Sequence, residues 1–79
     1  MRVGCLAVPY TSGVWIFEDF VVIDDMNHMT RWTGKVTAFG DVYVVLAVRV
    51  HRDLSVDRIL SSDGKIGWVY ERWLMPVKE

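Results

Sequence analysis

The run Asp63-Gly64-Lys65-Ile66-Gly67-Trp68-Val69-Tyr70-Glu71-Arg72-Trp73-Leu74 decides the fold of this 79-residue chain. Its Asp-Gly pair predicts a two-residue hairpin turn of type I′, because that turn needs positive φ angles, which glycine adopts without steric cost. After the turn, strand alternation places Ile66, Trp68 and Tyr70 on one face and Gly67 and Val69 on the other. The run therefore predicts a turn, a short strand, one 3₁₀-like turn and a final apolar plug.

Length and composition indicate one folded domain, residues 1–79. Hydrophobic residues make up 52% of the chain and charged residues 24%, which is typical of a globular protein. Four Trp, three Tyr and three Phe are more aromatic surface than so small a body can hide, so we expect some of it at an interface. The net charge of −1 provides no overall attraction to nucleic acid.

Several features bear on where the protein works. The single cysteine, Cys5, excludes an internal disulfide and favours a reducing compartment. No apolar run approaches the roughly 20 residues of a membrane span. The start of the chain does not resemble a signal peptide, since its short apolar run is broken by Gly4 and Pro9. We therefore expect a soluble, cytoplasmic protein with no membrane partner.

Apolar runs separated by turn residues predict an all-β fold of about five short strands and no helix, which is a small closed or nearly closed barrel. Residues 10–30 are expected to form a long, folded-over β-loop. Gly40-Asp41 is expected to be a type II′ hairpin turn, and residues 75–77 to lie beside the first strand. The expected strands cover residues 3–8, 30–39, 42–52, 56–60 and 66–70.

The longest expected strand, residues 42–52, is apolar on both faces. Alternation predicts one set of side chains in the core and the other outside, where its apolar end needs cover from another segment or another chain. The inward set is Val44, Leu46, Val48 and Val50, and the outward set is Tyr43, Val45, Ala47, Arg49 and His51.

The closing run resembles that of the Src-homology-3-like barrel, in which Gly-x-x-Gly and an aromatic or aliphatic residue precede Ile/Val-Pro-x-Asn-Tyr-Val/Leu. The matching residues are Gly64-Lys65-Ile66-Gly67-Trp68-Val69, followed by Tyr70-Glu71-Arg72-Trp73-Leu74. The resemblance implies that Val69 and Leu74 are core residues and that residues 71–73 form a single 3₁₀ turn. It also implies that residues 10–30 replace the first long loop of that five-stranded fold, which is often acidic.

The same run departs from the family where proline-rich peptides would bind. Tyr70, Arg72 and Trp73 stand in place of the Pro, Asn and Tyr of the family motif. Residues 61–74 are also similar to small barrel proteins of tailed bacteriophages, among which virion and accessory roles are common. That likeness implies the host cytoplasm or a virion as the location.

Nothing in the sequence predicts an enzyme, a metal site or a cofactor. Asp24-Asp25 with His28 has the composition of a metal or acid–base cluster, but neither His51 nor Cys5 has a spacing that would complete it. Gly64-x-x-Gly67 lies in a hairpin and not ahead of a helix, so it does not predict a phosphate loop. We expect a solvated acidic loop instead.

The function expected from these observations is a protein–protein interaction or structural module whose partner is another protein or copies of itself. Large aromatic residues are suited to anchor such an interface, although those of residues 15–20 could instead pack on the barrel as a lid. The expected contacts are Trp15, Phe17, Phe20, Tyr43, Trp68, Tyr70 and Trp73. An acidic loop of Glu18, Asp19, Asp24 and Asp25 would orient a basic partner.

The alternative is a small nucleic-acid-binding barrel or regulator. Small barrels bind single strands by stacking bases on aromatic side chains above a basic stripe, here beside Trp32 and Tyr43. The stripe would consist of Arg31, Lys35, Arg49, Arg52 and Arg58.

Overall fold

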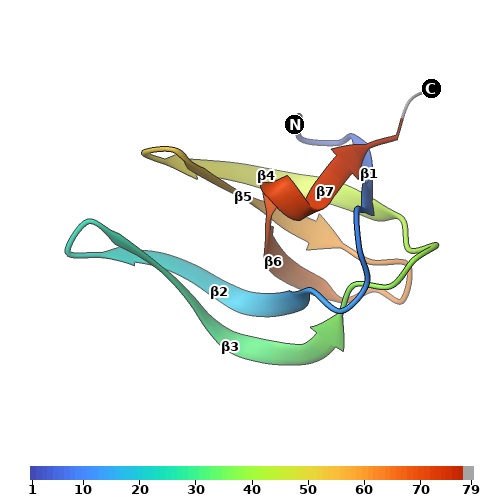
Figure 1. The fold of residues 1–79 in the computed structure, drawn as a ribbon, viewed down its shortest axis with the longest axis horizontal. Helices are drawn as coiled ribbons and strands as arrows, with labels where there is room; N and C mark the ends of the chain where they lie inside the picture. The colour runs from blue at the N-terminus through green and yellow to red at the C-terminus, as the bar shows by residue number, and fades with distance from the viewer. Residues whose placement is uncertain (78–79) are drawn as a thin grey trace.

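The computed structural model describes residues 1–77. Over that range the chain forms one curled antiparallel sheet, a half-barrel, in the order β3-β2-β6-β5-β4-β1-β7 (Figure 1). Its elements are β1 (Leu6–Pro9), β2 (Trp15–Ile23), β3 (Met26–Val36), β4 (Tyr43–His51), β5 (Leu54–Leu60), β6 (Ile66–Tyr70), the 3₁₀ turn η1 (Glu71–Trp73) and β7 (Leu74–Pro76).

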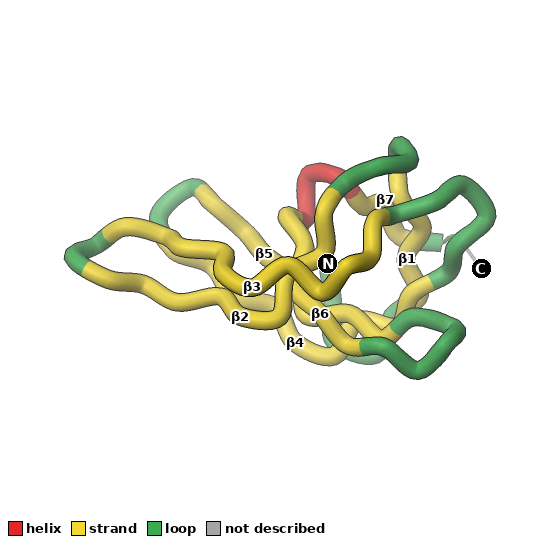
Figure 2. Tube along the Cα trace, turned by 90° about the horizontal axis from the view of Figure 1, so that it is seen from below, coloured by secondary structure: helices red, strands yellow, loops and turns green. Residues whose placement is uncertain are grey.

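The all-β prediction is confirmed, but the sheet of residues 1–77 has seven strands and not five. One extra strand is β2, because most of the expected loop at residues 10–30 is β2 and the first part of β3; the other is β7 at the end of the described chain. In Figure 2, β2 and β3 form a long twisted ribbon that extends away from the rest of the sheet. No helix among residues 1–77 is long and apolar enough to span a membrane.

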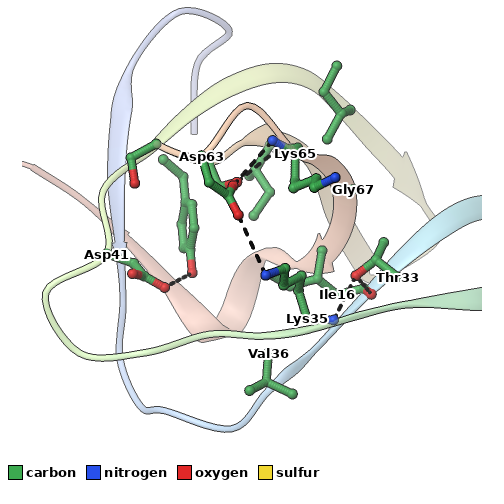
Figure 3. Close-up of a pocket in the computed structure, with 13 residues that line it drawn as sticks. Ile16, Thr33, Lys35, Val36, Asp41, Asp63, Lys65 and Gly67 are labelled. Carbon is green, nitrogen blue, oxygen red and sulfur yellow. Dashed lines mark hydrogen bonds and ion pairs between the residues drawn. The ribbon is translucent and has the colours of Figure 1, made fainter.

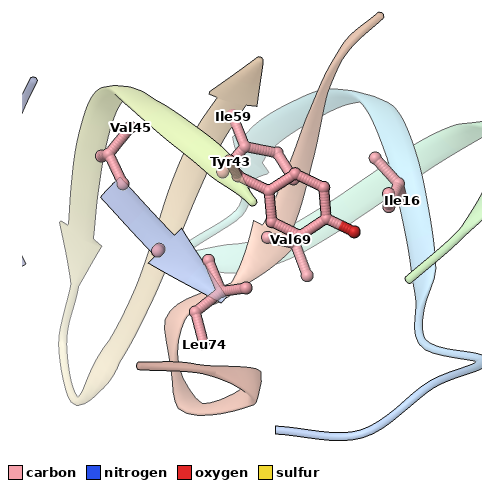
Figure 4. Packing of buried hydrophobic residues seen from close by; sticks show 7 residues of the cluster. Ile16, Tyr43, Val45, Ile59, Val69 and Leu74 are labelled. Atoms are coloured by element: carbon pink, nitrogen blue, oxygen red, sulfur yellow. The ribbon is translucent and has the colours of Figure 1, made fainter. Parts of the chain in front are cut away.

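The core lies inside the curl of the sheet and takes side chains from β1, β2, β4, β5, β6 and β7 (Figure 4). Small and β-branched residues dominate it, which suits closely packed strands. Its members are Ala7, Ile16, Tyr43, Val45, Ile59, Val69 and Leu74. The core positions implied for Val69 and Leu74 are therefore confirmed.

The predicted facing of strand β4 is wrong. Tyr43 and Val45 are buried, whereas Leu46 and Val50 are exposed. Both faces of this strand are apolar, so hydrophobicity cannot decide which one turns inward, and a register shift between Val45 and Ala47 further breaks the alternation. Burial of Tyr43 is possible because its hydroxyl donates a 2.8 Å hydrogen bond to Oδ2 of Asp41.

Two of the turns also differ from their prediction. Gly64 has positive φ but Asp63 does not, and the Gly64 N–H donates to the Ser61 carbonyl at 3.0 Å. The turn therefore spans four residues, 61–64, and is not a two-residue type I′ turn. Gly40-Asp41 does not close a hairpin, because β3 and β4 are not neighbours in the sheet.

A two-residue turn, Asp24-Asp25, joins β2 to β3. Both have positive φ, 50° and 63°, and Ile23 pairs with Met26 across them. Two central residues with positive φ are the mark of a type I′ turn, and aspartate is among the residues that tolerate this conformation. The expected flexible acidic segment is thus an ordered turn.

The C-terminal predictions are confirmed. Residues 71–73 form the 3₁₀ turn, and β7 lies beside β1 with Ala7 paired to Pro76 and Pro9 to Leu74. This pairing places the end of the described chain against its first strand.

Candidate functional site

The strongest candidate site is a face of the hairpin β2–β3 that points away from the core. Register pairs place Trp15 beside Val36, Phe17 beside Trp32 and Ile23 beside Met26. Directly paired residues share a face, and alternate residues along a strand do so too. We call this surface the outer face; it consists of Trp15, Phe17, Asp19, Val21 and Ile23 of β2 with Met26, His28, Thr30, Trp32 and Val36 of β3.

Aromatic stacking gives the outer face its centre. The rings of Trp15 and Trp32 are stacked, with centroids 4.9 Å apart and planes at 20°, and Phe17 lies 6.1 Å from Trp15. Trp15 is nevertheless 54% exposed and Trp32 48%. The two rings are therefore in contact with each other and still half open to solvent.

The inner face of the same hairpin packs against the rest of the chain. Ile16 enters the core, and Phe20 lies 5.7 Å from the ring of Trp68. Phe20 and Val22 line a groove with Trp68 and residues 49–51 of β4. The hairpin is thus apolar on both sides; on the inner side Ile16 is buried and Phe20 half-buried, whereas Val22, nearer the tip, is 44% exposed.

Two contacts fix the hairpin in position. At its base, the Thr33 hydroxyl donates to the Ile16 carbonyl at 2.8 Å, and Gly67 lies so close to Ile16 that a Cβ would overlap its Cγ2. At its tip, Asp25 pairs at 2.9 Å with His51, the last residue of β4, and also with Arg52 in the β4–β5 turn. The hairpin is held at both ends and presents its outer face as one surface.

The predicted contact aromatics do not form a single surface. Trp15 and Phe17 belong to the outer face. Trp68 of β6 pairs directly with Phe17 and lines a groove with Phe20. Tyr70 and Trp73 lie apart from both, on either side of Arg72, whose guanidinium carbon is 5.2 and 5.5 Å from their ring centroids.

Tyr43 was expected to be a contact residue, and this expectation is wrong. Its side chain is only 1% exposed and belongs to the core. Sequence reasoning instead missed Val21, Ile23, Met26 and Val36 as parts of the outer face. If residues 15–36 had been predicted as a β-hairpin, strand alternation would have placed these four residues on the same face as Trp15.

The four acidic residues expected in an orienting loop lie on a strand and a turn. Glu18 and Asp19 are in the middle of β2, and Asp24 and Asp25 form the hairpin turn. Asp19 lies 3.9 Å from Arg31, and Asp25 is paired at the tip as described. Part of this negative charge is therefore neutralised within the chain.

The expected basic stripe is divided between two parts of the sheet. Arg31 and Lys35 are on β3, and three strands separate them from β4, which carries Arg49. Three of the five cations are also paired with carboxylates, namely Arg31, Lys35 and Arg52. The expected stripe residues therefore lie in two groups, on β3 and on the β4–β5 hairpin.

A cavity of about 150 Å³ opens between β3 and the β5–β6 turn (Figure 3). Ile16, Tyr43 and Ile59 line its apolar part, and Lys35 and Asp63 form an ion pair of 3.8 Å beside it. A hydrogen bond from the Ser61 hydroxyl lowers the pKa of Asp63, and burial together with the bond to Asp41 raises that of Tyr43. The polar groups at this cavity mainly satisfy one another: the Ser61 hydroxyl donates to the Asp63 carboxylate, and that carboxylate also pairs with Lys35.

A second cluster of charge is enclosed at the other end of the sheet. Asp57 on β5 is fully buried, and neither carboxylate oxygen has a hydrogen-bond partner within residues 1–77. Burial and the nearby charge of Glu71 raise its pKa to about 7. Glu71 in turn lies 3.1 Å from the α-amino group of Met1, whose pKa it raises.

No group of three or more potential metal ligands occurs among the described residues. No known family, no curated protein and no solved structure matches this chain.

Proposed function

We propose that the chain is a non-enzymatic protein-interaction or structural module that docks through the outer face of the hairpin β2–β3. The observation that carries this proposal is the stacked, half-exposed pair of Trp15 and Trp32. Exposure of the apolar tryptophan rings to water is unfavourable, and a partner that covers them removes this cost. Tryptophan is also among the residues most enriched at interface hot spots.

The surroundings of the pair suit docking. Seven of the ten outer-face residues are apolar, and Asp19, His28 and Thr30 supply polar groups among them. An apolar centre excludes water, while a few polar groups fix the orientation of the partner. The two contacts that hold the hairpin reduce the conformational entropy lost when the partner binds.

The proposed module is a small Src-homology-3-like barrel. The 3₁₀ turn at residues 71–73 and the pairing of β7 with β1 support that assignment. The likeness of residues 61–74 to small barrel proteins of tailed bacteriophages is our reason for proposing a virion-associated or accessory role.

Site-specific photo-crosslinking tests the docking surface. A photoreactive phenylalanine analogue replaces Trp32 on the outer face or, as the control, Val50, which is 66% exposed on β4. Irradiation of cells that produce the chain should yield protein adducts from position 32 and few from position 50. Equal yields from both positions, or none from position 32, would refute the proposal.

A further inference from the structure

The outer face also bears on which protein the partner is; an inference about the partner rests on the proposed function. We propose that the outer face binds the outer face of a second copy of the chain, in a dimer with two-fold symmetry. In such an isologous contact each residue of the surface meets the same surface of the other copy. The area, composition, charge and shape of the outer face each bear on this proposal.

The apolar area of the outer face is close to what a stable dimer needs. Besides the two tryptophans, the exposed apolar residues are Val21, Ile23, Met26 and Val36. Taking 150–250 Å² for a whole large side chain, their exposed parts amount to roughly 500 Å² per copy. A standard interface buries about 800 Å² per partner, which the three polar positions and the margins of the face can complete.

The composition favours a permanent partner over a transient one. Transient interfaces are about as apolar as the rest of a protein surface, whereas homodimer interfaces are distinctly more apolar. Seven of the ten outer-face positions are apolar, which is in keeping with the second kind. A second copy is the one partner that is always present in equal amount.

The charge of the outer face permits self-association. A surface with several like charges would repel its own copy. Here Asp19 is the one carboxylate of the face, and Nε of Arg31 lies 3.9 Å from it. Two outer faces can therefore meet without an accumulation of like charge.

The shape favours packing of face on face over joining of edges. β3 is the last strand at one end of the sheet, so its edge could accept another strand. However, Arg31 and Gly34 have positive φ, 59° and 84°, and a register shift lies in the same part of the hairpin. Such irregularities interrupt strand addition, whereas two sheets can still pack with their side chains interdigitated.

Light scattering on the purified chain over a concentration series tests the dimer, with two valine variants as a matched pair. Val21→Lys places a charge in the proposed interface, and Val50→Lys places the same charge on an exposed strand residue outside it. We expect the natural sequence and Val50→Lys to be dimers, and Val21→Lys to raise the dimer Kd at least ~100-fold. Thermal unfolding confirms that each variant is folded, and Ile23→Lys, near the hairpin tip, replaces Val21→Lys if the latter fails to fold.

Two outcomes would overturn the inference. The first is a natural sequence that stays monomeric up to about 100 μM, a concentration at which even a Kd of 10 μM gives mostly dimer. The second is equal weakening by Val21→Lys and Val50→Lys. A monomeric chain that still forms adducts with a different protein from position 32 leaves the proposed function standing; a monomer without such adducts removes both.

Discussion

The enclosed strands of this sheet and its long hairpin use apolar residues in opposite ways. On β4, β5 and β6, Tyr43, Ile59 and Val69 are turned inward and are almost inaccessible to solvent. The hairpin β2–β3 contributes Ile16 to that core and leaves Trp15 and Trp32 half exposed. Strands β4 and β6 also carry exposed apolar residues, such as Val50 and Ile66; the hairpin differs in presenting a stacked pair of tryptophans.

We infer from this difference that the core residues determine the stability of the fold, whereas the outer face is available for binding. The core cluster is complete with one residue from the hairpin, so the outer face is not needed to enclose it. Small domains have little apolar surface to spare, because most of it must be buried to offset the loss of chain entropy. The apolar surface that the fold leaves open on the hairpin is therefore our reason for proposing contact with another molecule.

The sharpest test of this separation compares two aromatic residues. Tyr43→Ala should lower the free energy of unfolding by about 3–5 kcal/mol, because it leaves a cavity in the core and removes the partner of Asp41. Trp15→Ala should cost less than about 1.5 kcal/mol, since it loses mainly the stack with Trp32. Urea titration at low protein concentration measures both; similar losses would mean that the hairpin surface also serves stability.

Sequence reasoning located the enclosed region better than the hairpin. Residues 61–74 predicted β6 and the 3₁₀ turn, and their resemblance to the closing run of the Src-homology-3-like barrel implied that Val69 and Leu74 are core residues. Strand β4 offered no contrast between its two faces. With valine or leucine on both faces, its facing depends on a register shift that the sequence does not reveal.

The candidate site was predicted only in part, and the reason lies at the hairpin turn. Asp24-Asp25 lacks the glycine that usually indicates a type I′ turn, so residues 15–36 did not read as two paired strands. Without that pairing, Trp15 could not be placed beside Trp32. The burial of Asp57 was not predicted for a different reason: a carboxylate in a short strand, between Val56 and Arg58, is usually exposed to solvent.

Asp57 provides a pH-dependent test within the enclosed region. Folding raises its pKa from 3.8 to about 7, so the folded chain binds more protons than the unfolded chain between these values. The free energy of unfolding should therefore fall by roughly 2–4 kcal/mol as the pH rises from about 4 to 7. Urea titrations at several pH values measure this fall.

Asp57→Asn is the control, because it keeps the side-chain shape and removes the titration. The variant should be more stable than the natural chain at pH 7.5, by about 1–2 kcal/mol, and should have a flatter pH profile. The ion pair of Met1 with Glu71 does not contribute to this pH dependence. Folding raises the pKa of the Met1 α-amino group from 8.0, so the stability that this pair adds is lost only above about pH 8. Identical profiles for the two chains would show that Asp57 is not the group responsible.

A substitution at Gly67 tests the contact between β6 and the hairpin β2–β3. A Cβ at this position would overlap Cγ2 of Ile16 and lie 3.0 Å from the carbonyl oxygen of Phe17. Gly67→Ala should therefore destabilise the fold by about 2 kcal/mol, as overpacking commonly does. Because Ile16→Ala removes the overlapping atom, the same glycine substitution should cost clearly less in that background. A double-mutant cycle in urea measures the coupling. Equal costs in both backgrounds would mean that the hairpin is not seated on β6 through this contact, and that its outer face is not held as described.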